Sequence, residues 1–314
     1  MKKLTIVTIC LCVMSCAPAT AWDNFGHMQV AAVAWKRLDS LARERAGALL
    51  KLNPIYDRLI AGAAPEKRDQ IAFIRAAIWA DLIKLSSSGY ISDGTEGGNR
   101  PPPTPEASQN IGYADHFMHK YWHFVDKPFS PDGTPLEQPS TPNALTQIAV
   151  FRSTLSDAKA SDDVKSYDLV WLLHLVGDVH QPLHTTSRFT SGQTKGDAGG
   201  NFVKTRCAFP CAETNLHWFW DDAPGVDDDP EHAIAAAELL EAPDDQRASI
   251  ADENIWINES FELSKSVVYQ APVGVGVGPF TLTSNYKDSA ASTAKQQIAL
   301  AGTRLGNLLQ SALK

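Results

Sequence analysis

The segment from residue 166 to residue 181 is apolar on nearly every side, yet it contains His174 and Asp178, four residues apart. A helix that is apolar all round has to be buried at the centre of a fold. Residues four apart share one helix face, so this imidazole and this carboxylate point to the same place. A buried carboxylate is costly unless it is paired or binds a metal ion. The segment therefore predicts a central helix, ended by Pro182, that holds a polar site inside the core.

The same spacing of histidine and aspartate occurs again at His217 and Asp221, in a short helix predicted over 214–222. Asp81 continues the apolar stripe of a helix predicted over 68–85, which makes it another buried carboxylate. One histidine or aspartate in a core usually makes an ordinary hydrogen bond. A repeated set instead predicts a site for several metal ions, and imidazole with carboxylate suits zinc. The predicted ligands are His27, Asp81, His123, His174, Asp178, His184, His217 and Asp221.

The other four histidines are expected to have ordinary roles. His119 is four residues before His123 and so imitates the ligand spacing, but we assign it no metal. His180 fits a position behind the ligands or at the surface. His116 and His232 complete this group of residues without an expected role in the site.

Helical periodicity dominates the chain and predicts a mainly α fold. The segment 86–112 differs, because its glycines and prolines exclude regular structure, and a loop of this length is usually functional or disordered. No linker divides the chain, so we expect a single domain over 22–314. Helices are predicted at 27–50, 68–85, 166–181, 214–222, 229–243, 250–270 and 288–313, with weak strand signals at 200–205 and 278–283.

Residues 1–21 resemble a secretory signal: two lysines, an apolar stretch too short to span a bilayer, and a small-residue cleavage site at 19–21. We therefore expect a periplasmic or secreted protein without a membrane span. A lipoprotein cleavage before Cys16 is the alternative. Loss of the two lysines takes the net charge from −8 to −10. So acidic a protein is poorly suited to bind duplex phosphates by its own charge, and if it acts on nucleic acid, bound cations have to supply the attraction.

Cys207 and Cys211 remain after the signal, and an even number in an oxidising compartment favours a small-loop disulfide between them. A thiolate metal site or two free thiols are the alternatives. Cleavage after residue 21 would also make Trp22 the N-terminus, where its amine and carbonyl can chelate one metal ion. On composition alone, a tryptophan there is more often part of the core.

Six motifs in order give the chain a specific resemblance to the S1/P1 nuclease family, the secreted three-zinc nucleases specific for single strands. A further Ala-Gly-x-Arg-Leu at 301–305 extends the resemblance over essentially the whole mature chain. The motifs are Trp22-x-x-x-Gly26-His27, Trp79-Ala-Asp-x-x-Lys84, His123-Phe-Val-Asp126, His174-x-x-x-Asp178-x-His-Gln-Pro-Leu-His184, Gly199-Gly-Asn201 and Asn215-Leu-His-x-x-x-Asp221.

The resemblance implies a helical fold, similar also to zinc phospholipase C, with three zinc ions in a cleft. The first zinc would be held by Asp81, His123, His174 and Asp178. A close second would be held by the amine and carbonyl of Trp22, by His27 and by the bridging Asp178. The third, left partly open to water, would be held by His184, His217 and Asp221.

A base pocket is implied as well, in which Phe124 stacks on the base and Asp126, Gly199 and Asn201 contact its edges. An aromatic residue beside a metal ligand is a credible stacking platform. Asp81 would orient the nucleophile, and Lys84 would offset charge on the phosphorus. A lysine at the exposed end of a helix is otherwise an ordinary solvated side chain.

The function implied is hydrolysis of single-stranded DNA and RNA to 5′-phosphorylated products, with 3′-nucleotidase activity on nucleotides and no stable protein partner. The segments 92–108 and 188–198 look longer than the family pattern, and both are expected near the site. A zinc phospholipase C and a non-enzymatic periplasmic zinc-binding protein are the alternatives. The base-pocket motifs favour the nuclease, because a lipid headgroup needs no base pocket.

Overall fold

The computed structural model describes residues 22–206 and 214–313. The predicted signal, residues 1–21, and the predicted disulfide between Cys207 and Cys211 lie outside the described residues. None of the helices in the described part of the chain has the length and apolarity needed to cross a membrane.

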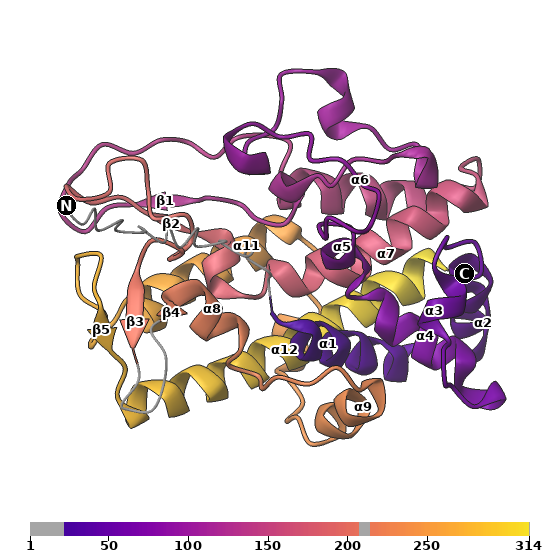
Figure 1. Ribbon diagram of the computed structural model, residues 1–314. Coiled ribbons are helices and arrows are strands. Elements are labelled where there is room, and N and C mark those ends of the chain that lie inside the picture. Colours follow the sequence, from indigo (N-terminus) through magenta and orange to yellow (C-terminus); the bar gives the residue numbers. More distant parts are fainter. Residues whose placement is uncertain (1–21, 207–213, 314) are drawn as a thin grey trace, which may run out of the picture.

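The fold is mainly helical, as predicted, with α7 in contact with most of the other long helices (Figure 1). The α-helices are α1 (Asn24–Arg37), α2 (Ser40–Leu50), α3 (Tyr56–Leu59), α4 (Arg68–Ala76), α5 (Trp79–Leu82), α6 (Ala144–Ser156), α7 (Asp162–Asp178), α8 (Leu216–Asp221), α9 (Pro230–Glu238), α10 (Asp245–Ala248), α11 (Glu253–Leu263) and α12 (Ser284–Ala312). Single 3-10 turns are η1 (Pro65–Lys67), η2 (Glu96–Gly98), η3 (Pro105–Ser108), η4 (Gly112–Ala114), η5 (Lys120–Trp122) and η6 (Pro182–Thr185), and a π-turn, η7 (Ser264–Val268), continues α11.

The central helix α7 confirms the prediction from its apolar sequence. Every residue from Ser166 to Asp178 is buried. The helix starts four residues earlier than predicted, because the Ser161 hydroxyl caps it by accepting a hydrogen bond from the backbone N–H of Val164 at 3.4 Å. It ends at Asp178, one turn before Pro182.

Two predicted helices are each divided in two. The segment 27–50 breaks between α1 and α2, where the Asp39 carboxylate accepts from the backbone N–H of Ala42 at 2.9 Å and starts a new helix. The segment 68–85 breaks between α4 and α5, at Ala77 and Ile78. This second break matters for the site, because it leaves the carbonyl of Ala77 available to a side chain of α7.

The strands are short and form two small sheets. β1 (Pro128–Phe129) pairs in parallel with β2 (Ser187–Arg188). β3 (Lys204–Arg206) lies between β4 (Thr214–Asn215), which is antiparallel to it, and β5 (Phe280–Thr281), which is parallel. Both strand predictions therefore hold in part, but the helix predicted from residue 214 begins only at Leu216. Beneath this sheet a second apolar core includes Leu216 and Trp220 of α8.

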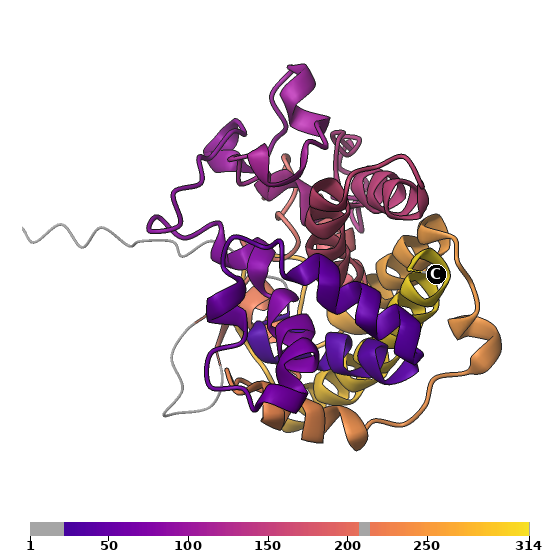
Figure 2. The ribbon, with the colours of Figure 1, turned by 90° about the vertical axis from the view of Figure 1, so that its right-hand side faces the viewer.

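The segment 86–112 has no regular structure beyond single turns and isolated β-bridges, as predicted, and stands above the helical body in the purple to magenta region of Figure 2. It is nevertheless anchored. The indole N–H of Trp122 donates to the carbonyl of Ala107 at 2.9 Å, and the Asp93 carboxylate accepts from the backbone N–H of His119 at 3.0 Å. These bonds connect the loop to the stretch that carries His123.

Candidate metal centre

The eight side chains predicted as ligands form three buried groups, in each of which the candidate ligand atoms lie within 4.8 Å of one another. They come from α1, α5, α7, α8, the turn η6 and the residue that follows η5, so segments far apart in sequence meet here. The groups are His27, His174 and Asp178; Asp81, His123 and His174; and His184, His217 and Asp221.

Asp178 joins the first two groups. Its Oδ1 lies 3.3 Å from Nε2 of His27 and 3.3 Å from Nε2 of His174, while its Oδ2 lies 3.0 Å from Nδ1 of His123. The ring of His27 stacks on that of His174 with a centroid separation of 3.8 Å. The Asp178 carboxylate therefore presents one oxygen to the first group and the other to the second, which is the arrangement needed to bridge two cations.

Backbone carbonyls fix the orientation of three of the rings. Nδ1 of His174 lies 2.7 Å from the carbonyl oxygen of Ala77, and Nδ1 of His184 lies 2.8 Å from that of His123. Nδ1 of His217 lies 2.7 Å from the carbonyl oxygen of Gly199. A carbonyl only accepts, so each Nδ1 carries the proton and each neutral ring keeps a lone pair on Nε2.

This tautomer has a consequence in the third group. Nε2 of His184 and Nε2 of His217 face each other at 3.0 Å. Two lone pairs at this separation repel, whereas a cation attracts both. The Asp221 carboxylate lies 3.6 Å from Nε2 of His217 and accepts from the amide of Gln181 at 2.7 Å, which orients it. The residues present therefore fit a metal ion.

Burial sets the charge state of these groups. It lowers the pKa of His27 to about 4 and the pKa values of His123, His174 and His184 well below their usual range. It raises the pKa values of Asp178 and Asp221 well above theirs. Imidazoles are thus neutral, as ligands must be, and a cation is what would keep these carboxylates ionised.

Several buried polar atoms of the set make no hydrogen bond. They include both ring nitrogens of His27, Oδ2 of Asp81, Nε2 of His123 and Oδ2 of Asp221. Buried polar groups are nearly always satisfied, so a cluster of unsatisfied ones needs an explanation. Metal coordination would satisfy the atoms that point into the groups.

Trp22 is fully buried beside the first group. Two glycines allow this approach: a Cβ on Gly26 would lie 2.6 Å from Cβ of Trp22, and one on Gly177 would lie 2.9 Å from Nδ1 of His27. The next backbone N–H, of Asp23, donates to the carbonyl of Asp221 at 3.1 Å. The start of the described chain is therefore held against two of the three groups, while chelation by the Trp22 amine stays a prediction.

Lys84 is not the solvated lysine considered from the sequence. It is only 7 % exposed and forms an ion pair with Asp81, one turn earlier. Its side chain also lines a cavity of about 410 Å³ together with His123, His184 and His217. An ammonium group at the wall of this cavity is placed to meet an anionic substrate.

The four residues predicted to bind a base all line the same cavity: Phe124, Asp126, Gly199 and Asn201. Phe124 and Asp126 are half-buried. Burial is the main cause that raises the pKa of Asp126 to about 7; the charge of Asp197 adds to it and that of Arg100 opposes it. Gly199 has a φ of +60°, and a Cβ there would overlap the carbonyl of Leu183, so the position requires glycine.

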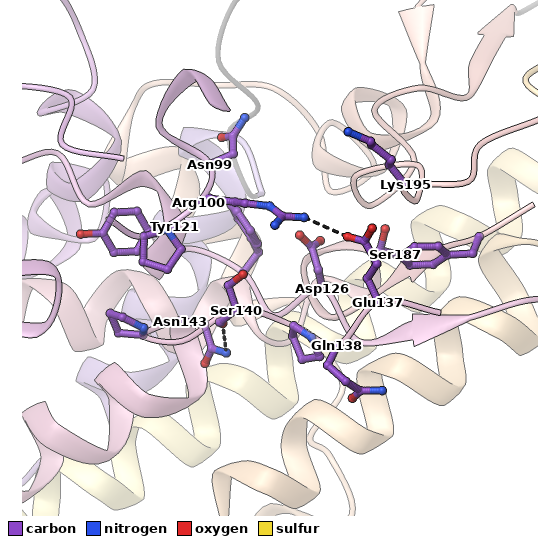
Figure 3. Close-up of a pocket in the computed structure, with 15 residues that line it drawn as sticks. Asn99, Arg100, Tyr121, Asp126, Glu137, Gln138, Ser140, Asn143, Ser187 and Lys195 are labelled. Atoms are coloured by element: carbon purple, nitrogen blue, oxygen red, sulfur yellow. Dashed lines mark hydrogen bonds and ion pairs between the residues drawn. The ribbon is translucent and has the colours of Figure 1, made fainter. Parts of the chain in front are cut away.

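Phe124 and Asp126 also border a smaller hollow of about 60 Å³ (Figure 3). Arg100 and Lys195 come to it from the segments 92–108 and 188–198, which the sequence predicted near the site. Figure 3 shows Arg100 pointing across the hollow to Glu137, with a separation of 2.9 Å between Nη2 and Oε2. The predicted base pocket is therefore flanked by both of these segments.

The remaining histidines lie outside the three groups. His119 is buried between Asp115, at 2.8 Å, and Asp93, at 2.9 Å, so its ligand-like spacing serves another purpose. His180 is fully buried, which excludes the surface role considered for it, and its Nε2 faces Nη1 of Arg304 at 3.0 Å. His116 and His232 are exposed.

Sequence reasoning missed the groups that orient the ligands. The carbonyls of Ala77, His123 and Gly199 and the amide of Gln181 carry out this function. Of these, only Gln181 gave a signal, because it stands inside the motif that contains His174 and His184. Backbone carbonyls leave no trace in a sequence.

Comparison with known proteins gives a family for the chain. The family model described as S1/P1 Nuclease matches residues 22–314. Two curated proteins of Arabidopsis thaliana, Endonuclease 4 and Endonuclease 3, are 36 % and 38 % identical to the chain over 81 residues, which is 24 % of this chain and 24 % of each relative. The chain thus spans about a quarter of the length of the curated relatives it matches.

Proposed function

Because the chain belongs to the S1/P1 nuclease family, we propose that it is a zinc-dependent phosphodiesterase. Its substrates would be single-stranded DNA and RNA, cleaved to 5′-phosphorylated products, and it would also act on nucleotides as a 3′-nucleotidase. The observation that carries this proposal is the pair of Nε2 atoms of His184 and His217 facing each other at 3.0 Å at the wall of the cavity. Residues 22–314 would form one nuclease domain, exported to the periplasm or the medium.

Three zinc ions would occupy the three groups. Asp81, His123, His174 and Asp178 would hold the first; Trp22, His27 and Asp178 the second; and His184, His217 and Asp221 the third. Zinc would supply a Lewis acid and lower the pKa of a water molecule toward about 7.

The chain's own residues would then position the substrate. Asp81 accepts a hydrogen bond from the attacking water and orients it toward the phosphorus. Lys84, held by its ion pair with Asp81, lies against the phosphate oxygens and offsets the charge that develops on them. The departing O3′ would lie on the side of His217, which leaves the phosphate on the 5′ end of the product.

Preference for single strands would come from the base pocket. Phe124 can stack on a base only when that base has left the duplex. Asp126, Gly199 and Asn201 line the same cavity, so the edges of a stacked base would meet their polar groups. These four residues argue against a phospholipase C, whose substrate has no base. The buried Lys84 argues against a protein that only stores zinc, because an ammonium group at the wall of the cavity serves an anionic substrate and has no role in storage.

A direct test uses purified protein that begins at Trp22, supplied with zinc. It would be incubated with single-stranded DNA, the matching duplex, single-stranded RNA and phosphatidylcholine, and the product ends would be identified by mass spectrometry. We expect 5′-phosphorylated fragments from both single strands and slow or no cleavage of the duplex. Release of phosphocholine without cleavage of any oligonucleotide would show a phospholipase instead, and no hydrolysis at full zinc content would favour storage.

A further inference from the structure

Phe202 has a side chain that is 62 % exposed although it lines the same cavity as the candidate ligands. Among the residues that the structure describes, it is the only exposed large apolar side chain on the wall of this cavity. An exposed aromatic ring at the mouth of a polar cavity offers a surface on which a flat ligand can stack. The metal groups and the base contacts proposed above do not use it.

Ordered backbone holds this ring in place. The backbone N–H of Phe202 donates to the carbonyl of Asp197 at 3.1 Å, and its carbonyl accepts from the amide of Gln193 at 3.1 Å. Asp197 is itself fully buried and fixed, since its carboxylate accepts from the backbone N–H of Arg188 at 2.9 Å and from the hydroxyl of Tyr269 at 2.8 Å. Stacking on Phe202 would therefore order little additional backbone, which favours binding.

Lys120 lies on the wall of the cavity that the loop 86–112 helps to form. Its aliphatic chain runs along Gly98, where a Cβ would lie 2.8 Å from Cδ of the lysine, and its Nζ lies 3.5 Å from the carbonyl oxygen of Gly97. The side chain is half-buried, so the ammonium group keeps access to solvent. The cavity thus contains a second lysine in addition to Lys84, which pairs with Asp81.

We propose that Phe202 and Lys120 form a second nucleotide subsite, an inference that rests on the proposed function. Phe202 stacks on the base next to the one held by Phe124, and Lys120 pairs with the phosphate that flanks this second base. The occupant is a neighbouring nucleotide of the same single strand. Stacking tolerates every base, because each one has a π face. The subsite therefore increases the affinity for longer strands without selecting a sequence.

The proposed subsite predicts that loss of Phe202 affects KM and kcat differently. Phe202 lies away from the reacting phosphorus in this arrangement, so its loss weakens binding of substrate and transition state alike and raises KM with little change in kcat. Stacking of one base on an aromatic ring corresponds to about five- to 150-fold in affinity. A substrate with a single base cannot reach Phe202 and is unaffected by its loss.

The test compares octathymidylate with the methyl ester of thymidine 3′-phosphate, a diester that carries one base. In Phe202→Ala and Phe202→Leu we expect KM for the octamer to rise about tenfold, while kcat/KM for the single-base diester stays within about twofold of the native protein. Phe202→Tyr keeps the π face and should behave as the native protein does. In Lys120→Gln the salt dependence of octamer binding should weaken by about 0.7 in the slope of log K against log salt, the value of one single-strand phosphate contact.

Leu239→Ala is the matched control, since Leu239 is 86 % exposed and lies at the end of α9, outside the cavity. Equal effects of Phe202→Ala on both substrates, or no effect on the octamer, would overturn the second subsite while leaving the nuclease assignment in place. If the native protein hydrolyses neither substrate at full zinc content, the proposed function fails and the subsite fails with it. Because Phe202 is exposed, zinc content and the thermal unfolding midpoint of its variants should match those of the native protein.

Discussion

The carbonyl oxygen of Gly199 accepts a hydrogen bond from Nδ1 of His217 at 2.7 Å, so one residue of the proposed base pocket also orients a proposed zinc ligand. Base binding and metal binding would thereby be coupled through a single peptide unit. The conformation depends on glycine, because φ is +60° and a Cβ would overlap the carbonyl of Leu183.

Gly199→Ala should therefore damage both functions. The left-handed backbone alone costs about 1–2 kcal/mol for a residue with a Cβ, and the overlap with Leu183 forces the carbonyl away from His217. We expect a fall in zinc content together with the loss of most nuclease activity, measured on one sample by mass spectrometry and by oligonucleotide cleavage. Gly192→Ala is the control in the same segment, because Gly192 is exposed and a Cβ there would approach no atom closer than 4.0 Å. Unchanged zinc content in Gly199→Ala would refute the coupling.

Removing either proposed zinc ligand of α8 should abolish most hydrolysis without unfolding the protein. His217→Ala and Asp221→Ala each delete a side chain of the third group, and changes to residues behind metal ligands already cost about 10–100-fold in metal affinity or activity. We expect at least about a 100-fold loss in kcat/KM and about one zinc fewer per chain. His232→Ala, which changes an exposed histidine paired with Asp227, should be neutral. Near-native rates at reduced zinc content would count against the assignment.

Phe124→Ala should weaken single-stranded substrates more than a phosphodiester that carries no base or other aromatic ring, such as the methyl ester of abasic deoxyribose 3′-phosphate. Stacking of a base on an aromatic ring contributes about 1–3 kcal/mol, so kcat/KM for an oligonucleotide should fall by about one to two orders of magnitude. Phe129→Ala changes another half-buried phenylalanine, one that packs against Phe261 and Tyr269, and serves as the control. The same loss on both kinds of substrate would mean that Phe124 only packs in the core and does not bind a base.

The sequence was sufficient to predict the centre of the fold, because polar residues stand there in a helix whose apolar sequence requires burial. His174 and Asp178 interrupt an apolar helix, and a shared metal ion would resolve that conflict. The boundaries of the surrounding helices were harder to predict from the sequence. Asp39 divides the segment 27–50 by capping a new helix, but an aspartate inside a helical pattern is equally compatible with an exposed face.

Lys84 shows why the finer parts of the site could not be predicted. Its place at the end of a helix suggests solvent, and its burial comes from elements far away in the sequence, which close over it to form the cavity. The same holds for Phe202, where no local pattern distinguishes an exposed ring in a cavity from a core side chain of the neighbouring sheet. Contacts between segments that are far apart in the sequence determine the surroundings of Lys84 and of Phe202, and local periodicity contains no information about such contacts.

Base preference should change with pH through Asp126. Burial raises its pKa to about 7, so in the free protein the carboxyl is protonated below that pH and ionised above it. The ionised form only accepts hydrogen bonds, which suits the N–H donors on the edge of guanine, whereas the protonated form can donate to adenine. The ratio of kcat/KM for guanine over adenine dinucleotides should therefore rise about three- to tenfold between about pH 6 and pH 8. In Asp126→Asn the ratio should not change with pH, and a native profile in that variant would assign the titration to another group.

The last prediction concerns the amine of Trp22. If this amine is a zinc ligand, one extra residue before Trp22 turns it into an amide, which is a poor ligand at neutral pH. The carbonyl and His27 would remain, but the chelate ring would be lost, so the second group should lose affinity for its metal. We expect protein with a retained methionine before Trp22 to bind about two zinc ions and to be nearly inactive, while protein that begins at Trp22 binds about three and is active. Removal of the methionine by an aminopeptidase should restore both the third zinc ion and the activity, which distinguishes loss of the ligand from misfolding.

The lipoprotein alternative predicts the opposite, because cleavage before Cys16 leaves Trp22 internal. N-terminal sequencing of the exported, fully active protein decides between them, and a lipidated Cys16 on that material would exclude Trp22 as a ligand through its amine.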